Sequence, residues 1–153
     1  MALRKQPYLP LYVEDFMTEE KLAMCSASAT GVYIRLMCLM HKSEEYGVIS
    51  LKDKDILSDE KTENFSKKLE KNMPFSFEII ERGLTELLDE NVVCIKGNKL
   101  IQKRMVKDEK LSNIRASAGK KGGKKRAENE ARFAQAKIQA NTKANVEANA
   151  EIE

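Results

Sequence analysis

Residues 92–105 read Val-Val-Cys-Ile-Lys-Gly-Asn-Lys-Leu-Ile-Gln-Lys-Arg-Met, with the runs 92–95 and 100–105 on either side of a Gly-Asn pair. Glycine readily adopts the positive φ that a two-residue hairpin loop requires, so this stretch predicts two antiparallel strands joined by that pair. A loop of that length places Ile95 opposite Leu100. Cys94 then lies opposite Ile101.

The segments before this hairpin are predicted to be mostly helical. Apolar side chains recur at helical spacing over residues 29–42, which follow Ser28. The same pattern covers residues 77–90, which follow Ser76, and serine is a favoured residue at a helix N-cap. Between the two helices, residues 46–50 are short and rich in β-branched side chains, as expected of a strand.

Shorter helices are expected at 18–24, 53–57 and 62–72, whereas Pro7 and Pro10 favour an extended N-terminal segment. The resulting order is helix, short strand, two helices and hairpin, which is the order of a winged helix-turn-helix domain. We therefore predict an α+β, mostly helical fold. It is a winged helix-turn-helix with a C-terminal β-hairpin wing, followed by a basic tail that is flexible or helical.

The predicted domain covers residues 1–106. Residues 107–153 form a basic Gly/Lys linker and an Ala/Asn-rich tail. Few large apolar side chains occur there, so burial cannot offset the entropy of ordering a second globular domain.

The net charge of +3 over 153 residues conceals a strongly uneven distribution. Residues 96–126 carry 12 Lys and Arg against two Asp and Glu, a net charge of +10. Residues 1–95 carry 12 against 17, a net charge of −5, and residues 127–153 carry −2. The basic residues thus form one concentrated block.

Several classes of protein are excluded early. No apolar run approaches the roughly 18–20 residues of a membrane span. Two acidic residues, Glu14 and Asp15, interrupt the N-terminal segment before a secretory signal would be complete. Cys25, Cys38 and Cys94 are odd in number and widely spaced, as in reduced proteins rather than in a disulfide framework or a zinc site. We therefore expect a cytoplasmic protein without a metal.

The sequence contains no catalytic pattern. His41 is the single histidine and ends a helix, where an imidazolium suits the helix dipole and covers a carbonyl group. The acidic pairs at 44–45 and 59–60 are neighbours along the chain and do not face each other across a substrate. Residues 119–123 lack the Gly-x-x-x-x-Gly-Lys-Ser/Thr pattern of a phosphate-binding loop. We expect a protein that is not an enzyme and needs no cofactor.

The basic block defines the candidate DNA-binding residues. It begins at Lys96 and Lys99 beside the hairpin turn, continues along the predicted second strand at Lys103 and Arg104, and then enters the tail. Cations on a wing and its extension can neutralise phosphates over a long stretch of duplex. The candidates are Lys96, Lys99, Lys103, Arg104, Lys107, Lys110, Arg115, Lys120, Lys121, Lys124, Lys125 and Arg126. A weaker basic set precedes them and consists of Lys61, Lys67, Lys68 and Lys71.

The helix that enters the major groove in a standard winged helix is here acidic. Residues 77–90 carry five acidic side chains and only Arg82 as a cation, a net charge of −4. DNA contact is therefore expected through the wing and tail, with little base reading by this helix. Alternatively, the acidic helix or the N-terminal segment binds a protein partner, or exposed strand edges mediate self-association into a homo-oligomer. A winged-helix transcription regulator is a further alternative.

Two motifs resemble those of one family. Residues 10–16, Pro-Leu-Tyr-Val-Glu-Asp-Phe, match a P-x-Y-x-x-D-[FW] start, and residues 31–39 resemble its G-x-Y-x-x-L-L-x-L helix. The run 102–108, with 118–123 after it, is similar to that family's exit from its wing. These features resemble the N-terminal domains of bacteriophage replication-initiation (replisome-organiser) proteins.

That resemblance covers roughly residues 7–126. It implies a winged helix related to the N-terminal domain of the bacterial primosomal protein DnaD. The implied function is DNA or origin binding during phage or prophage replication, in the cytoplasm of a bacterial host. Such proteins commonly continue into a second domain that contacts the replicative helicase or its loader, which are therefore the implied protein partners. This chain ends at Glu153, either as a short member or as a piece of a longer protein.

Overall fold

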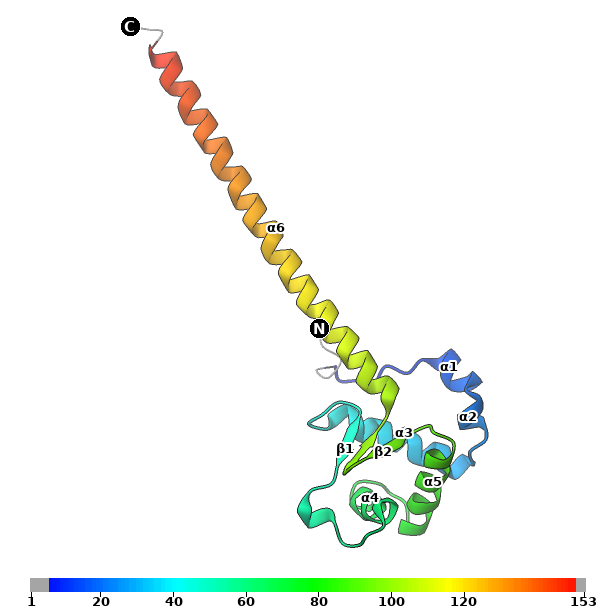
Figure 1. Ribbon diagram of the computed structural model, residues 1–153. Helices are drawn as coiled ribbons and strands as arrows, with labels where there is room; N and C mark the ends of the chain where they lie inside the picture. The colour runs from blue at the N-terminus through cyan, green and yellow to red at the C-terminus, as the bar shows by residue number, and fades with distance from the viewer. Residues whose placement is uncertain (1–5, 151–153) are drawn as a thin grey trace. The chain divides into compact units, whose positions relative to one another are not determined.

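The computed structural model describes residues 6–150. These divide into two compact units, the first ending at Ser112 and the second beginning at Asn113. Figure 1 shows the elements, and the strands of the described residues all belong to the first unit. In chain order they are α1 (Val13–Thr18), α2 (Glu20–Ala23), α3 (Ala27–Lys42), β1 (Val48–Ser50), the 3₁₀ helix η2 (Asp53–Asp55), α4 (Lys61–Glu70), α5 (Phe77–Asp89), β2 (Cys94–Lys96), β3 (Lys99–Ile101) and α6 (Lys103–Ala150).

The predicted hairpin is confirmed in its register, but its second strand is shorter than expected. Strand β3 ends at Ile101, and Lys103 and Arg104 lie in the first turn of α6 instead of on the strand, because the Gln102 side chain caps that turn. Ile95 pairs with Leu100, and Cys94 pairs with Ile101. Gly97 has a φ of 60°, the positive value that the two-residue loop requires. Strand β1 pairs with the other side of β3, which gives a three-stranded antiparallel sheet in the order β1-β3-β2. The predicted α+β, mostly helical class is therefore confirmed.

The core of the first unit lies between α3, α4, α5 and one face of the sheet. Helices α3 and α5 approach closely at Gly83, where an added Cβ would lie 3.0 Å from a methyl group of Val32 and 3.3 Å from the backbone of Ala29. Close packing of this kind fixes the two helices against each other. Fully buried side chains from the helices and the sheet include Val32, Leu36, Phe65, Ile80, Leu84, Leu87 and Leu100.

The N-cap of α3 differs from the prediction. Ser26 rather than Ser28 caps the helix, and its Oγ accepts a hydrogen bond from the Ala29 N–H at 3.1 Å. The Glu86 carboxylate of α5 in turn accepts hydrogen bonds from Ser26 N–H at 3.1 Å and Oγ–H at 2.6 Å. Glu86 lies 60 residues from Ser26 along the chain, so the residues around the start of α3 give no sign of this contact.

The N-terminal prediction was wrong in two respects. Helix α1 occupies part of the segment expected to be extended, because its first residue lies beyond the reach of Pro10. Thr18 ends this helix instead of beginning one, and its hydroxyl donates to the Glu14 carbonyl at 2.8 Å. Glu19 is extended and separates α1 from α2.

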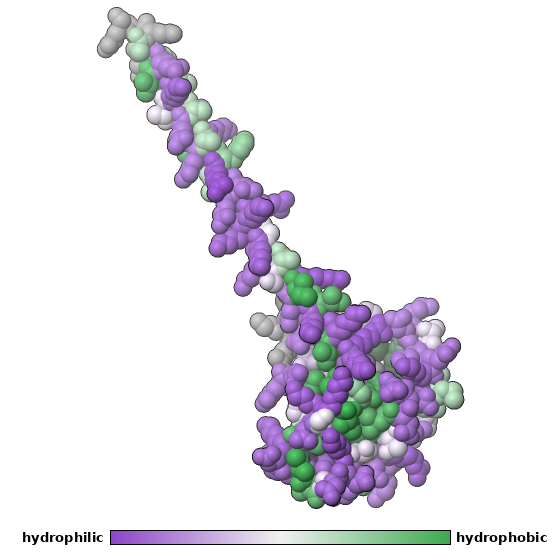
Figure 2. Space-filling view, viewed as in Figure 1, coloured by the Kyte–Doolittle hydropathy of each residue, from purple (hydrophilic) through white to green (hydrophobic). Residues whose placement is uncertain are grey.

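The predicted boundary between residues 106 and 107 falls inside α6, and the first unit reaches Ser112. Within the second unit the tail is helical, one of the two expected states, and every described side chain from residue 113 onward is exposed. Figure 2 shows a mainly hydrophilic surface along this part of α6. None of the helices in residues 6–150 is both long and apolar enough to cross a membrane.

Candidate nucleic-acid interface

The turn end of the hairpin presents two exposed lysines. Lys96 and Lys99 are register partners at the last pair of the β2–β3 ladder, one on each side of the loop. Nζ of Lys99 lies 2.8 Å from Oε2 of Glu45, and both side chains of this ion pair are about half exposed. Lys96 makes no ion pair within the part of the chain that the structure describes.

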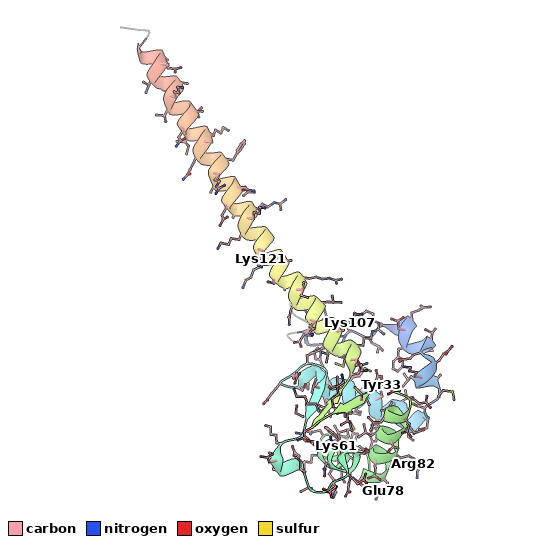
Figure 3. The ribbon with its side chains drawn as sticks, in the orientation of Figure 1. Tyr33, Lys61, Glu78, Arg82, Lys107 and Lys121 are labelled. Atoms are coloured by element: carbon pink, nitrogen blue, oxygen red, sulfur yellow. The ribbon has the colours of Figure 1, made fainter. Side chains whose placement is uncertain are left out.

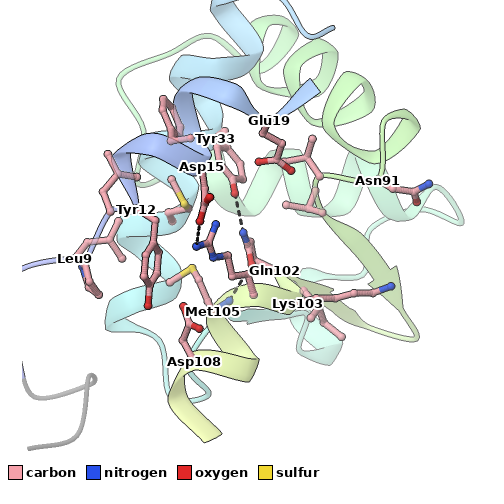
Figure 4. A pocket seen from close by; sticks show the side chains of 18 of the residues that line it. Leu9, Tyr12, Asp15, Glu19, Tyr33, Asn91, Gln102, Lys103, Met105 and Asp108 are labelled. Atoms are coloured by element: carbon pink, nitrogen blue, oxygen red, sulfur yellow. Dashed lines mark hydrogen bonds and ion pairs between the residues drawn. The ribbon is translucent and has the colours of Figure 1, made fainter. Parts of the chain in front are cut away.

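Gln102 fixes the place where α6 begins. Its side chain is buried, and its Nε2 donates to the Tyr33 hydroxyl of α3 at 2.7 Å. Its Oε1 accepts a hydrogen bond from the Met105 N–H at 2.9 Å, so this side chain also caps the first turn of α6 (Figure 4). The pKa of the Tyr33 hydroxyl is raised, mainly because the side chain is buried. The exposed Lys103 therefore lies on a turn anchored to the core.

Arg104 follows on the same turn and contacts the N-terminal segment. Its Nη2 atom lies 2.5 Å from Oδ2 of Asp15, and its guanidinium carbon lies 4.1 Å from the centroid of the Tyr12 ring (Figure 4). Both side chains of the ion pair are exposed, at 42% for Arg104 and 60% for Asp15. The guanidinium is thus held by one carboxylate and one aromatic face while remaining open to solvent.

A pocket of about 450 Å³ lies beside this contact, between the N-terminal segment, α3, the hairpin and the first turn of α6. Its lining mixes aromatic, amide and charged side chains (Figure 4). Because Asp15, Glu19 and Asp108 share the lining with Lys103 and Arg104, neither sign of charge dominates the pocket.

The other predicted cations lie along α6. Lys107 and Lys110 are exposed within the first unit. The remaining six belong to the second unit, and all are exposed: Arg115, Lys120, Lys121, Lys124, Lys125 and Arg126. Within that unit the four lysines form two pairs spaced by four residues, which brings them onto neighbouring parts of one helical face. Figure 3 shows side chains projecting from the helix, with Lys107 and Lys121 labelled.

The acidic side chains of α5 differ in whether they are exposed or bonded to another part of the fold. Glu78 and Asp89 are exposed, as is Arg82 (Figure 3). Glu86 is engaged by the N-terminus of α3 and serves the fold. The uncovered face of α5 therefore remains acidic, and phosphates would be repelled from it.

Two further cations next to the hairpin were missed by the sequence analysis. The Leu51 N–H donates to the Asn98 carbonyl at 2.8 Å, which brings the chain after β1 to the hairpin loop. The exposed Lys52 and Lys54 follow directly. The pairing of β1 with β3 places them there, and the sequence carried no signal for that pairing.

The weaker basic set on α4 divides into structural and free members. Lys68 Nζ donates to the Ser50 carbonyl at 2.6 Å and pairs with Asp55 Oδ2 at 3.0 Å. The pKa of the Asp55 carboxyl is lowered. The largest cause is the hydrogen bond from the Lys52 N–H, and the next is the hydrogen bond from Lys68. Lys67 pairs with Glu63 on its own helix at 2.9 Å. In this set, Lys61 and Lys71 are exposed.

We expected His41 to cover a carbonyl group at the end of its helix. The structure shows instead that its ring bonds a carbonyl from the N-terminal segment. Its ring is buried, and Nε2 donates to the Gln6 carbonyl at 2.9 Å. Nδ1 lies 2.9 Å from the Tyr46 hydroxyl. The ring therefore links the N-terminal segment to the end of α3, a role that depends on a contact 35 residues away.

Within residues 6–150, no three His, Cys, Asp or Glu side chains come together as ligands for a metal ion. Comparisons with protein-family models, with curated proteins and with solved structures find no match to this chain. The candidate interface therefore rests on its own residues and their geometry.

Proposed function

We propose that this chain is a winged-helix, DNA-binding protein of phage or prophage replication initiation. In this proposal the β2–β3 hairpin is the wing, and the hairpin together with the basic residues of α6 contacts phosphates. The order of helices around a β1-β3-β2 sheet supports the fold assignment. The family resemblance described above supports the biological role.

The observation that carries the proposal is the exposure of the cations at the hairpin. Lys96 and Lys99 lie at its turn, and Lys103 lies on the anchored turn after β3. Cations displayed in this way release counterions when they neutralise phosphates. The acidic α5 argues for contact with the backbone rather than with base edges, so we expect weak sequence preference.

A salt titration of DNA affinity tests the proposal. For duplex DNA, log K falls with log[salt] with a slope of about −0.9 per phosphate neutralised, and about −0.7 for single strands. Replacing Lys96 and Lys99 by Gln should weaken binding. It should also make the slope shallower by the amount expected for one to two lost phosphate contacts. Replacing Lys120, Lys121, Lys124 and Lys125 by Gln tests α6 in the same way.

Matched lysines outside the candidate set provide controls. Lys21 and Lys42 are exposed in the first unit, and Lys137 and Lys143 are exposed in the second. Gln substitution of Lys21 and Lys42 removes the same two charges as the hairpin variant, and Gln substitution of all four control lysines removes the same four charges as the α6 variant. Both control variants should leave the slope nearly unchanged. Equal losses in the candidate and control variants would contradict the proposal.

A second candidate function is a replisome adaptor, possessing a docking surface for a protein such as a helicase, its loader or another copy of this chain. It is favoured by exposed apolar side chains near the N-terminus, where Val13, Met17 and Met24 are 64%, 74% and 74% exposed. Light scattering and pull-down with replication proteins test this role. A chain that stays strictly monomeric and binds no replication protein would contradict the adaptor role. Sequence-specific binding to duplex DNA would instead favour a transcription regulator.

A further inference from the structure

Two of the cations in the candidate interface are paired with carboxylates from distant parts of the chain. Asp15, which pairs with Arg104, lies 89 residues from it. Glu45, which pairs with Lys99, lies 54 residues from it. The fold itself therefore brings an anion to each cation, and neither contact is a pairing of helical neighbours.

The contact at Arg104 is arranged as an anion site. The guanidinium carbon lies over the Tyr12 ring, 4.1 Å from its centroid, and the Asp15 carboxylate meets the Nη2 atom. Guanidinium groups bind carboxylate and phosphate oxygens with the same fork geometry. The Asp15 oxygen at Nη2 therefore occupies a position that a phosphate oxygen can take.

Both pairs are exposed enough to exchange. The side chains are 42% and 60% exposed for Arg104 and Asp15, and 50% and 53% for Lys99 and Glu45. Exposed ion pairs of this kind stabilise a protein only slightly, because water solvates the separated charges well. A polyanion that releases counterions on binding can therefore displace either carboxylate.

The segment carrying Asp15 does not depend on this ion pair for its position. The adjacent Phe16 stacks on Tyr33 with ring centroids 6.5 Å apart, and the Gln6 carbonyl accepts from His41 at 2.9 Å. Glu45 is likewise held through its backbone carbonyl, which accepts from the Val48 N–H at 3.1 Å. Exchange therefore requires a rotation of each carboxylate side chain and no unfolding.

Building on the proposed function, we infer that Arg104 and Lys99 are two phosphate subsites that Asp15 and Glu45 occupy in the free protein. DNA phosphates replace the two carboxylates on binding, and the carboxylates act as internal competitors that lower the affinity. The site at Arg104 also includes the Tyr12 face, which keeps the guanidinium in place when its anion changes.

The test measures duplex DNA affinity across salt concentration for Asp15→Asn and Glu45→Gln in the full chain. Each variant has a matched control one residue away, Glu14→Gln and Glu44→Gln, because both neighbours are exposed acids without an ion pair in the described part of the chain. We expect Asp15→Asn and Glu45→Gln each to bind about two- to fivefold more tightly than its control at low salt. The gain should shrink as salt rises.

A double mutant locates the effect at Arg104. Asp15→Asn should give no gain in an Arg104→Ala background, because the competing carboxylate then has no cation to release. Unchanged thermal unfolding of Asp15→Asn shows that affinity alone has changed. Equal affinities for Asp15→Asn and Glu14→Gln, or a gain that persists without Arg104, would overturn the inference while leaving the proposed function intact. Loss of DNA binding by the unmodified chain at every salt concentration would reject both.

Discussion

The β2–β3 hairpin and helix α5 are consecutive in the chain, and their charges differ in sign and in use. The hairpin lysines lie at a turn, where they contribute little to the core. Helix α5 packs through Ile80, Leu84 and Leu87, and one of its acids, Glu86, accepts hydrogen bonds from Ser26, the N-cap residue of α3. Charge on the hairpin is therefore available for a ligand, whereas α5 is primarily a structural element with an acidic outer face.

The largest expected effect lies in the buried face of α5. Leu84 is fully buried, so Leu84→Ala should lower the free energy of unfolding by about 2–5 kcal/mol through lost contacts and a residual cavity. Denaturant unfolding followed by circular dichroism measures this. Lys96→Gln on the exposed hairpin should change it by less than about 0.5 kcal/mol. A comparable loss in both variants would remove the distinction between the two regions.

The next effect concerns Asp55, the carboxylate that holds Lys68 at the end of β1. Asp55→Asn should cost about 1–3 kcal/mol at neutral pH, since the carboxylate holds both Lys68 Nζ and the Lys52 N–H. The folded state lowers the pKa of Asp55 below its ordinary value of 3.8. Its contribution is therefore complete above that value and is lost as pH falls through the folded-state pKa.

Unfolding curves for the unmodified chain and Asp55→Asn, measured from about pH 7 to about pH 3, test this sign. The difference between them should stay constant at the upper end and shrink only below about pH 4. A difference that grows on acidification would contradict the assignment. Asp53→Asn, which alters an exposed neighbour, is the matched control.

The hairpin loop should show a smaller effect of its own. Gly97 has a φ of 60° and open space around it, so Gly97→Ala should cost about 1–2 kcal/mol from backbone strain alone. Asn98→Ala, at the adjacent position without a positive φ, should cost less. Thermal unfolding of the two variants measures the difference, and equal midpoints would argue against strain at Gly97.

The smallest expected effect distinguishes the acids of α5 from one another. Glu86→Gln should cost about 1 kcal/mol by weakening its hydrogen bonds to Ser26, whereas Glu78→Gln should be nearly neutral. Chemical denaturation of both variants tests this. If the two losses are equal, Glu86 has no special role at the start of α3.

Local rules predicted the features that depend on neighbouring residues. The length of the Gly-Asn loop fixed the pairing of Ile95 with Leu100, and the serine before residue 77 marked the start of α5. The α3 cap was misplaced by two residues because Glu86, far along the chain, reinforces Ser26.

The candidate interface was predictable in its composition but not in its contacts. The clustering of Lys and Arg in residues 96–126 is visible in the sequence. The approach of Asp15 to Arg104 and the placement of Lys52 beside the hairpin depend on tertiary structure. Contacts between residues so far apart leave no periodic signal in a single sequence.

The buried ring of His41 provides a built-in reporter. It is the chain's only histidine, and it bonds the Gln6 carbonyl on one side and contacts the Tyr46 hydroxyl on the other. Its imidazole resonances in a proton–nitrogen spectrum therefore arise from one residue without overlap. They should move when the N-terminal segment leaves the surface and stay fixed when only the Asp15 carboxylate rotates, so one signal separates segment release from side-chain exchange.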